Sequence, residues 1–180
     1  MKKTVIAVFI LSLLLSVSAN ADVHKLKNLS KGMEPTIGEQ DEICVTDYDR
    51  QFPVVIGGGI FFKTYSEVER YDVIVFRWPD DASEFMVKRV IGLPGETVKI
   101  TEEGKVYIGD SDVPLNDDFI LEPMTWSFTS TYEVPEKSYF VLGDNRNNSK
   151  DSRFWENTFV KRGYICGKVI ANYTDGTFIE

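Results

Sequence analysis

The chain has 180 residues, a formal net charge of −8 and 43% hydrophobic residues. This length and hydrophobic content predict one compact globular unit and argue against a disordered tail or an array of several domains. The negative charge argues against nucleic acid as a partner, because a protein that follows a phosphate backbone needs a basic surface.

The N-terminal segment has the layout of a secretory signal peptide. Two lysines follow the first methionine, an apolar run extends from Val5 to Val17, and small residues occupy 19–21. The run is shorter than the roughly 20 apolar residues of a spanning helix, which favours cleavage after Ala21 over retention as an anchor. We therefore expect residues 1–21 to be a signal peptide or N-terminal membrane anchor. The protein is then exported, to the periplasm or the extracytoplasmic face of the membrane, and residues 22–180 form its β domain.

Short apolar runs rich in β-branched and aromatic residues follow, separated by Gly and Pro. The runs of strand length lie at 43–45, 73–76, 86–91, 97–100, 106–108, 138–142 and 164–170. They predict an all-β, mostly antiparallel domain. Residues 101–105 are typical of a hairpin turn, 151–158 of a loop or short helical turn, and 48–53 of a bent strand or a loop.

Several kinds of site are disfavoured by residue counts. The only histidine is His24, which argues against a Ser-His-Asp triad and, with two cysteines, against a four-ligand zinc site. Gly57–Gly59 lacks the Gly-Lys-Ser/Thr continuation of a phosphate loop and is interpreted as a flexible connection. Cys44 and Cys166 form either one disulfide or two buried thiols. We expect no cofactor and no metal.

The hydrolytic chemistry that remains is a hydroxyl nucleophile with a lysine base. Lys88 interrupts an apolar strand, between Phe85–Val87 and Val90–Ile91. Burial there would lower the pKa of its amine toward the working pH. By pattern alone, a lysine that points outward from a half-exposed strand is the more common case.

Three segments resemble, in order and spacing, the signature boxes of the signal peptidase I family of Ser/Lys peptidases. They are Met-Glu-Pro-Thr at 33–36, Lys-Arg-Val-Ile-Gly-Leu-Pro-Gly at 88–95, and Gly-Asp-Asn-Arg-Asn-Asn-Ser-Lys-Asp-Ser-Arg at 143–153. Residues 70–76 resemble the family strand before the lysine box, with tyrosine in place of its usual glycine. The resemblance covers about 30–170 and implies a partly closed, barrel-like sheet.

The resemblance also implies roles for single residues. Lys88 matches the general base, and Ser149 matches the serine that hydrogen-bonds and aims the lysine amine. Arg89 and Asp144 match a supporting ion pair. Ser30 matches a hydroxyl of the oxyanion hole, with a turn serine that bonds its own backbone as the alternative.

A substrate surface follows from the same resemblance. It implies a strand edge that pairs with an extended polypeptide, such as the signal peptide of an exported protein, and that is lined by Met33, Phe85, Met86 and Val87. Contact with the membrane surface is also expected, with Met33, Phe52, Phe61 and Phe62 as candidates. Ordinary core aromatics are the alternative for the phenylalanines.

The chain departs from the family at the nucleophile. The family places its serine directly before the methionine, and here that residue is Gly32. Without a hydroxyl no acyl-enzyme forms by the family route, which predicts an impaired peptidase that binds polypeptide, with secretion and pilus or conjugation assembly as candidate roles. The alternatives are an active endopeptidase that cleaves after small residues, and a β domain kept only as a scaffold.

Overall fold

The computed structural model describes residues 23–47, 51–56, 59–64, 67–125 and 128–179. The predicted signal peptide or anchor, 1–21, lies outside these residues. No helix in the described part is long and apolar enough to cross a membrane.

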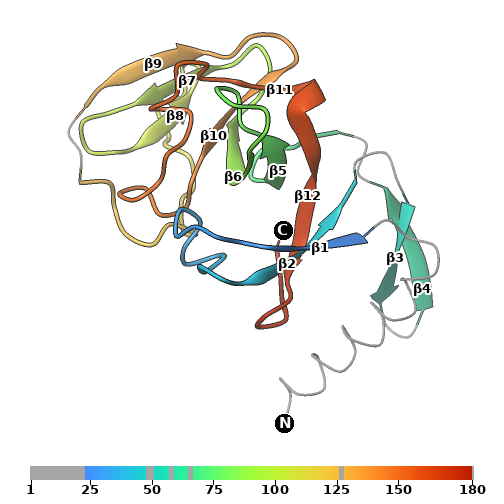
Figure 1. Cartoon of the computed structure of the whole chain (residues 1–180). Helices are drawn as coiled ribbons and strands as arrows, with labels where there is room; N and C mark the ends of the chain where they lie inside the picture. Colours follow the sequence, from blue (N-terminus) through green and yellow to red (C-terminus); the bar gives the residue numbers. More distant parts are fainter. Residues whose placement is uncertain (1–22, 48–50, 57–58, 65–66, 126–127, 180) are drawn as a thin grey trace.

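The described chain is built almost entirely of antiparallel strands, as predicted (Figure 1). The main sheet has the order β1-β2-β12-β5-β6-β10-β11, and β13 pairs with β12. Its strands are β1 (Val23–Lys27), β2 (Glu42–Thr46), β5 (Val73–Arg77), β6 (Phe85–Gly92), β10 (Ser138–Leu142), β11 (Val160–Lys161), β12 (Ile165–Asn172) and β13 (Thr177–Phe178). A short 3₁₀ helix, Arg162–Tyr164, precedes β12.

Two smaller sheets accompany the main one. The first has the order β8-β7-β9, from β7 (Thr97–Ile100), β8 (Val106–Ile108) and β9 (Ser130–Glu133). Its β7–β8 turn is the predicted hairpin, closed by a hydrogen bond from the Thr101 amide to the Lys105 carbonyl (3.0 Å). The second is the hairpin of β3 (Gln51–Ile56) and β4 (Gly59–Thr64), which projects away from the main sheet in Figure 1.

Strand β5 shows why these apolar runs are strands buried on both faces. Val73 and Val75 enter one hydrophobic core, while Ile74 and Phe76 enter another on the opposite face. The same alternation divides β6, because Lys88 pairs with Ile74 whereas Arg89 pairs with Val73. Lys88 and Arg89 therefore start on opposite faces of the sheet.

The two cysteines do not form a disulfide. Cys44 pairs with Ala171, at the other end of β12 from Cys166, and both thiols are free. Cys44 is buried, as the two-thiol alternative required, but Cys166 is exposed. Its position before the first β12–β2 pair leaves it uncovered by β2.

Candidate active site

Lys88 is a buried lysine in the interior of β6, with 3% of its surface exposed. Its Nζ donates a hydrogen bond to the Val87 carbonyl oxygen (2.9 Å). Burial lowers the pKa of Lys88 from its ordinary value of 10.5; the charges of Asp151 and Asp144 oppose this shift, and Arg153 adds to it. The amine therefore loses its proton more readily than an exposed lysine does.

Gly32 faces this amine. A Cβ atom built on Gly32 would lie 3.1 Å from Lys88 Nζ and 3.5 Å from Ser149 Oγ. Ser149 Oγ is buried and has no hydrogen-bond partner in the described part of the chain. Three residues that the family resemblance placed in one site are thus brought together from three distant segments, but the expected hydrogen bond between Ser149 and the Lys88 amine is not formed among the described residues.

A loop between β1 and β2 carries Gly32 to this position. Its base is closed by paired backbone hydrogen bonds between Asn28 and the segment 40–41. Its tip is held by Asn145, whose amide donates to the Gly32 carbonyl (3.2 Å) and whose Nδ2 donates to the Lys31 carbonyl (3.2 Å). Asn145 belongs to the Gly-Asp-Asn-Arg box, but its role in holding the loop was not predicted from the sequence.

Gly143 allows the two loops to touch. A Cβ atom there would overlap both Ser149 Oγ and the Gly32 carbonyl oxygen. No side chain fits there, so the glycine is required by close approach of backbone. Because β10 pairs with β6, the chain that leaves β10 at this glycine passes directly beside Lys88.

Arg89 and Asp144 form the expected ion pair behind the site. Arg89 Nε donates to Asp144 Oδ1 (2.9 Å) and Nη2 to Oδ2 (2.6 Å), with 5% and 1% of the two side chains exposed. Three further contacts complete the environment: Thr36 donates to Asp144, Arg89 donates to the Tyr71 carbonyl, and its guanidinium lies over the Phe119 ring. No role for Thr36, Tyr71 or Phe119 was predicted from the sequence.

A second buried carboxylate braces the same loop. Asp151 accepts a hydrogen bond from the Gly143 amide (3.0 Å) and pairs with Arg153 through Nε (2.8 Å) and Nη2 (2.9 Å). Asp151 is fully buried, although its segment was predicted to be a polar loop. The segment does lack strand structure, but it packs inward through these bonds.

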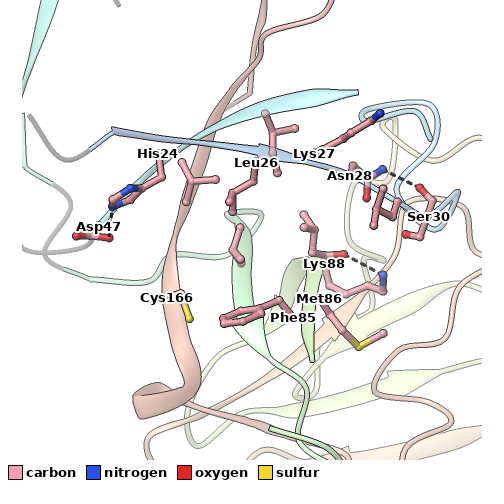
Figure 2. A pocket seen from close by; sticks show the side chains of 15 residues that line it. His24, Leu26, Lys27, Asn28, Ser30, Asp47, Phe85, Met86, Lys88 and Cys166 are labelled. Carbon is pink, nitrogen blue, oxygen red and sulfur yellow. Dashed lines mark hydrogen bonds and ion pairs between the residues drawn. The ribbon is translucent and has the colours of Figure 1, made fainter. Parts of the chain in front are cut away.

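A groove of about 590 Å³ leads to Lys88. Figure 2 shows β1 and the residues after it along one side, and the start of β6 along the other. It is lined by Leu26 and Ser30 on the first side and by Phe85, Met86, Val87 and Lys88 on the second.

Ser30 and Met33 differ in exposure. Ser30 is exposed in the groove, and its carbonyl accepts a hydrogen bond from Asn28 Nδ2 (2.7 Å). Met33, expected at the substrate surface and as a membrane contact, is instead fully buried and packs with Ile37 and Val73. A turn closed by a hydrogen bond from the Ile37 amide to the Met33 carbonyl (2.9 Å) brings the two residues together, and both side chains are buried.

Two predictions remain, one for the phenylalanines expected at the membrane surface and one for the absence of a metal site. The side chains of Phe52, Phe61 and Phe62 lie outside the described part of the chain. Among the described residues, no group of three or more His, Cys, Asp or Glu side chains is placed to hold a metal ion.

Known proteins resemble this chain over most of its length. The family model described as signal peptidase, peptidase S26, matches residues 1–174. A signal peptidase I of Leptolyngbya laminosa is 36% identical over 152 residues, covering 80% of this chain and 65% of that protein. Signal peptidase I V of Bacillus subtilis is 32% identical over 145 residues, covering 72% and 73%. The match thus spans about two thirds to three quarters of these relatives.

A solved structure is also similar. The crystal structure of a signal peptidase I from Enterococcus faecalis has 36% sequence identity with this chain and a TM-score of 0.48. The match covers 57% of this chain and 96% of that one.

Proposed function

We propose, since this chain belongs to the peptidase S26 family of signal peptidases, that it binds the signal-peptide region of exported precursors and is impaired in cutting them. One observation carries the proposal. The side-chain position of residue 32 lies 3.1 Å from the Lys88 amine, where a nucleophile would meet its base, and glycine supplies no oxygen there.

The base side of the chemistry is intact. A general base must be within hydrogen-bond reach of the proton it removes and must be neutral at the working pH. The 3.1 Å between the Cβ position of residue 32 and Lys88 Nζ supports such reach for a serine hydroxyl there, and burial lowers the pKa of Lys88. With Gly32, the amine has no hydroxyl to deprotonate, so an acyl-enzyme cannot form on this residue.

The groove suits an extended peptide. Strand β1 is an edge of the main sheet, so one side of its backbone is open to pair with an added strand. Across the groove, Phe85, Met86 and Val87 offer an apolar wall that ends at Lys88. A signal-peptide cleavage site is an extended segment with small residues beside the scissile bond. We infer that such a segment binds in the groove with its small residues next to the Lys88 amine.

Exposed apolar side chains around the groove favour work at a membrane surface. Leu26, Leu29 and Phe85 are 41%, 71% and 57% exposed and all line the groove. Such clustered exposed apolar groups mark contact surfaces rather than ordinary protein exterior. We place the protein at the extracytoplasmic face of the membrane, as a binder of precursors in secretion or in pilus or conjugation assembly.

The test measures binding and cleavage together. A labelled peptide with an Ala-x-Ala junction is titrated with the full chain in detergent micelles, and its anisotropy and products are recorded. We expect the parent protein to bind it and Phe85→Asp to weaken binding about tenfold, by loss of one apolar contact side chain. Phe178→Asp is the matched control, because Phe178 is similarly exposed (61%) but lies outside the groove. Equal effects of the two changes would rule out the groove as the binding site.

A further inference from the structure

The place of the missing side chain is bounded by polar atoms. The two nearest atoms to a Cβ on Gly32 are an amine nitrogen, Lys88 Nζ, and a hydroxyl oxygen, Ser149 Oγ. A water molecule has about the volume of a hydroxymethyl group, roughly 30 Å³, and needs two to four polar partners. The side-chain position of residue 32 therefore offers polar partners for one water.

Both polar atoms have bonding capacity to spare. Ser149 Oγ is buried and has no partner in the described chain, a costly state that a bound water relieves. The Lys88 amine uses one N–H for the Val87 carbonyl. When the amine is neutral, its lone pair remains to accept a proton from the water.

We propose that this water replaces the serine hydroxyl and that the protein slowly hydrolyses its bound peptide by direct attack, without an acyl-enzyme. Lys88 removes one proton from the water as the water oxygen bonds to the scissile carbonyl carbon. The C–N bond then breaks, and the lysine ammonium returns the proton to the leaving amine. The products are a carboxylic acid and a new amino terminus, and the only atoms consumed are those of water.

The reaction is slower than that of a serine enzyme. A water held by hydrogen bonds is less well positioned than a hydroxyl fixed by a covalent bond, and positioning contributes large factors to rate. Sites that lose a nucleophile retain about 10³–10⁴-fold acceleration over water through binding and oxyanion stabilisation. This inference rests on the proposed binding of the peptide in the groove.

Gly32→Ala is the sharpest test, because its methyl group takes the water's place while adding no hydroxyl. The full chain is incubated with the Ala-x-Ala peptide, and cleavage is followed for days by mass spectrometry, with peptide binding measured in parallel. We expect slow cleavage by the parent that falls at least about tenfold in Gly32→Ala and in Lys88→Ala, each change removing a group needed in the transition state. Lys161→Ala, a change of an exposed lysine far along the chain, leaves the rate unchanged.

Intact-mass analysis after acid quenching separates the two routes. The parent shows no covalent peptide adduct, whereas Gly32→Ser accumulates one. Parent cleavage that survives in Gly32→Ala, or a parent adduct, overturns the water route. Binding without any cleavage by the parent overturns this inference alone, and absence of both binding and cleavage overturns the proposed function with it.

Discussion

Lys88 and Arg89 are neighbours on β6, both cationic and both buried, yet they sit in opposite environments. Arg89 shares two hydrogen bonds with Asp144 and lies over an aromatic ring. Lys88 has no carboxylate partner within the described chain and donates only to its neighbour's carbonyl. One cation is fully paired, and the other is kept without a bonded counter-charge.

This difference indicates that Arg89 supports the structure of the site, whereas Lys88 takes part in its chemistry. A buried cation without a paired carboxylate destabilises the fold, and such costs are concentrated at functional sites. The pairing at Arg89 holds the loop of Asp144 in place, whereas the isolation of Lys88 lowers its pKa as a base requires. The site is prepared for proton transfer although Gly32 brings no hydroxyl.

A hydroxyl at residue 32, beside the unpaired Lys88 amine, should have the largest effect, and the effect is on cleavage activity. We expect Gly32→Ser to raise kcat/KM for an Ala-x-Ala peptide by about 10³–10⁴-fold, because nucleophile and base then act as a unit. Adding Lys88→Ala should remove the gain. Gly163→Ser is the matched control, since a side chain at Gly163 meets nothing within 4 Å. If Gly32→Ser cleaves no faster than this control, residue 32 is not the nucleophile position.

Breaking the paired side should cost stability instead. We expect Asp144→Asn to lower the free energy of unfolding by about 3–5 kcal/mol, because it leaves the Arg89 charge buried without its counter-ion. Urea denaturation measures the change. Asp110→Asn is the control: Asp110 pairs with Lys99 (3.2 Å) in full solvent exposure, so its loss should cost at most about 1 kcal/mol. Similar costs for both changes would show that burial does not strengthen the pair.

Replacing Lys88 should change the free energy of unfolding in the opposite direction. We expect Lys88→Met to raise the free energy of unfolding by about 1–3 kcal/mol at neutral pH, because it removes the desolvation cost that lowers the pKa of the buried amine. The pKa of Lys88 is lowered in the folded state, so the parent gains stability as pH rises from that lowered value toward 10.5. The advantage of Lys88→Met should therefore shrink across this range. A variant less stable than the parent at neutral pH would contradict the assignment, with Lys161→Met as the reference for loss of an exposed lysine.

Much of the fold, and the family, were predicted from the sequence. The apolar runs at 73–76 and 138–142 became β5 and β10, because strands buried on both faces are continuously apolar. Strand β1 was missed, since Val23–Lys27 holds two lysines and a histidine along an exposed edge. Edge strands with one partner lack the apolar run on which the prediction depended.

The site was predictable in its residues but not in its burial. Lys88, Gly32 and Ser149 converge as the motif order implied. Met33 and Asp151 turned inward against their local pattern, because a hydrogen-bonded turn holds the first, and hydrogen bonds from Gly143 and Arg153 hold the second. Such hydrogen bonds depend on the geometry of turns and loops, which strand periodicity does not reveal.

Removing the Ser149 hydroxyl should have the smallest effect on stability. This effect distinguishes a hydroxyl without a protein hydrogen bond from one that is hydrogen-bonded. We expect Ser149→Ala to change the free energy of unfolding by less than about 1 kcal/mol, because no protein hydrogen bond to this oxygen is lost in the described chain. Ser152→Ala is the matched control: Ser152 Oγ accepts from the buried Val141 amide (3.0 Å), so its loss should cost about 1–3 kcal/mol. In the Gly32→Ser background, Ser149→Ala should lower kcat about tenfold with little change in KM, since Ser149 Oγ lies 3.5 Å from the side-chain position of residue 32 and does not line the groove. A larger stability loss than that of Ser152→Ala would mean that this hydroxyl is a structural group.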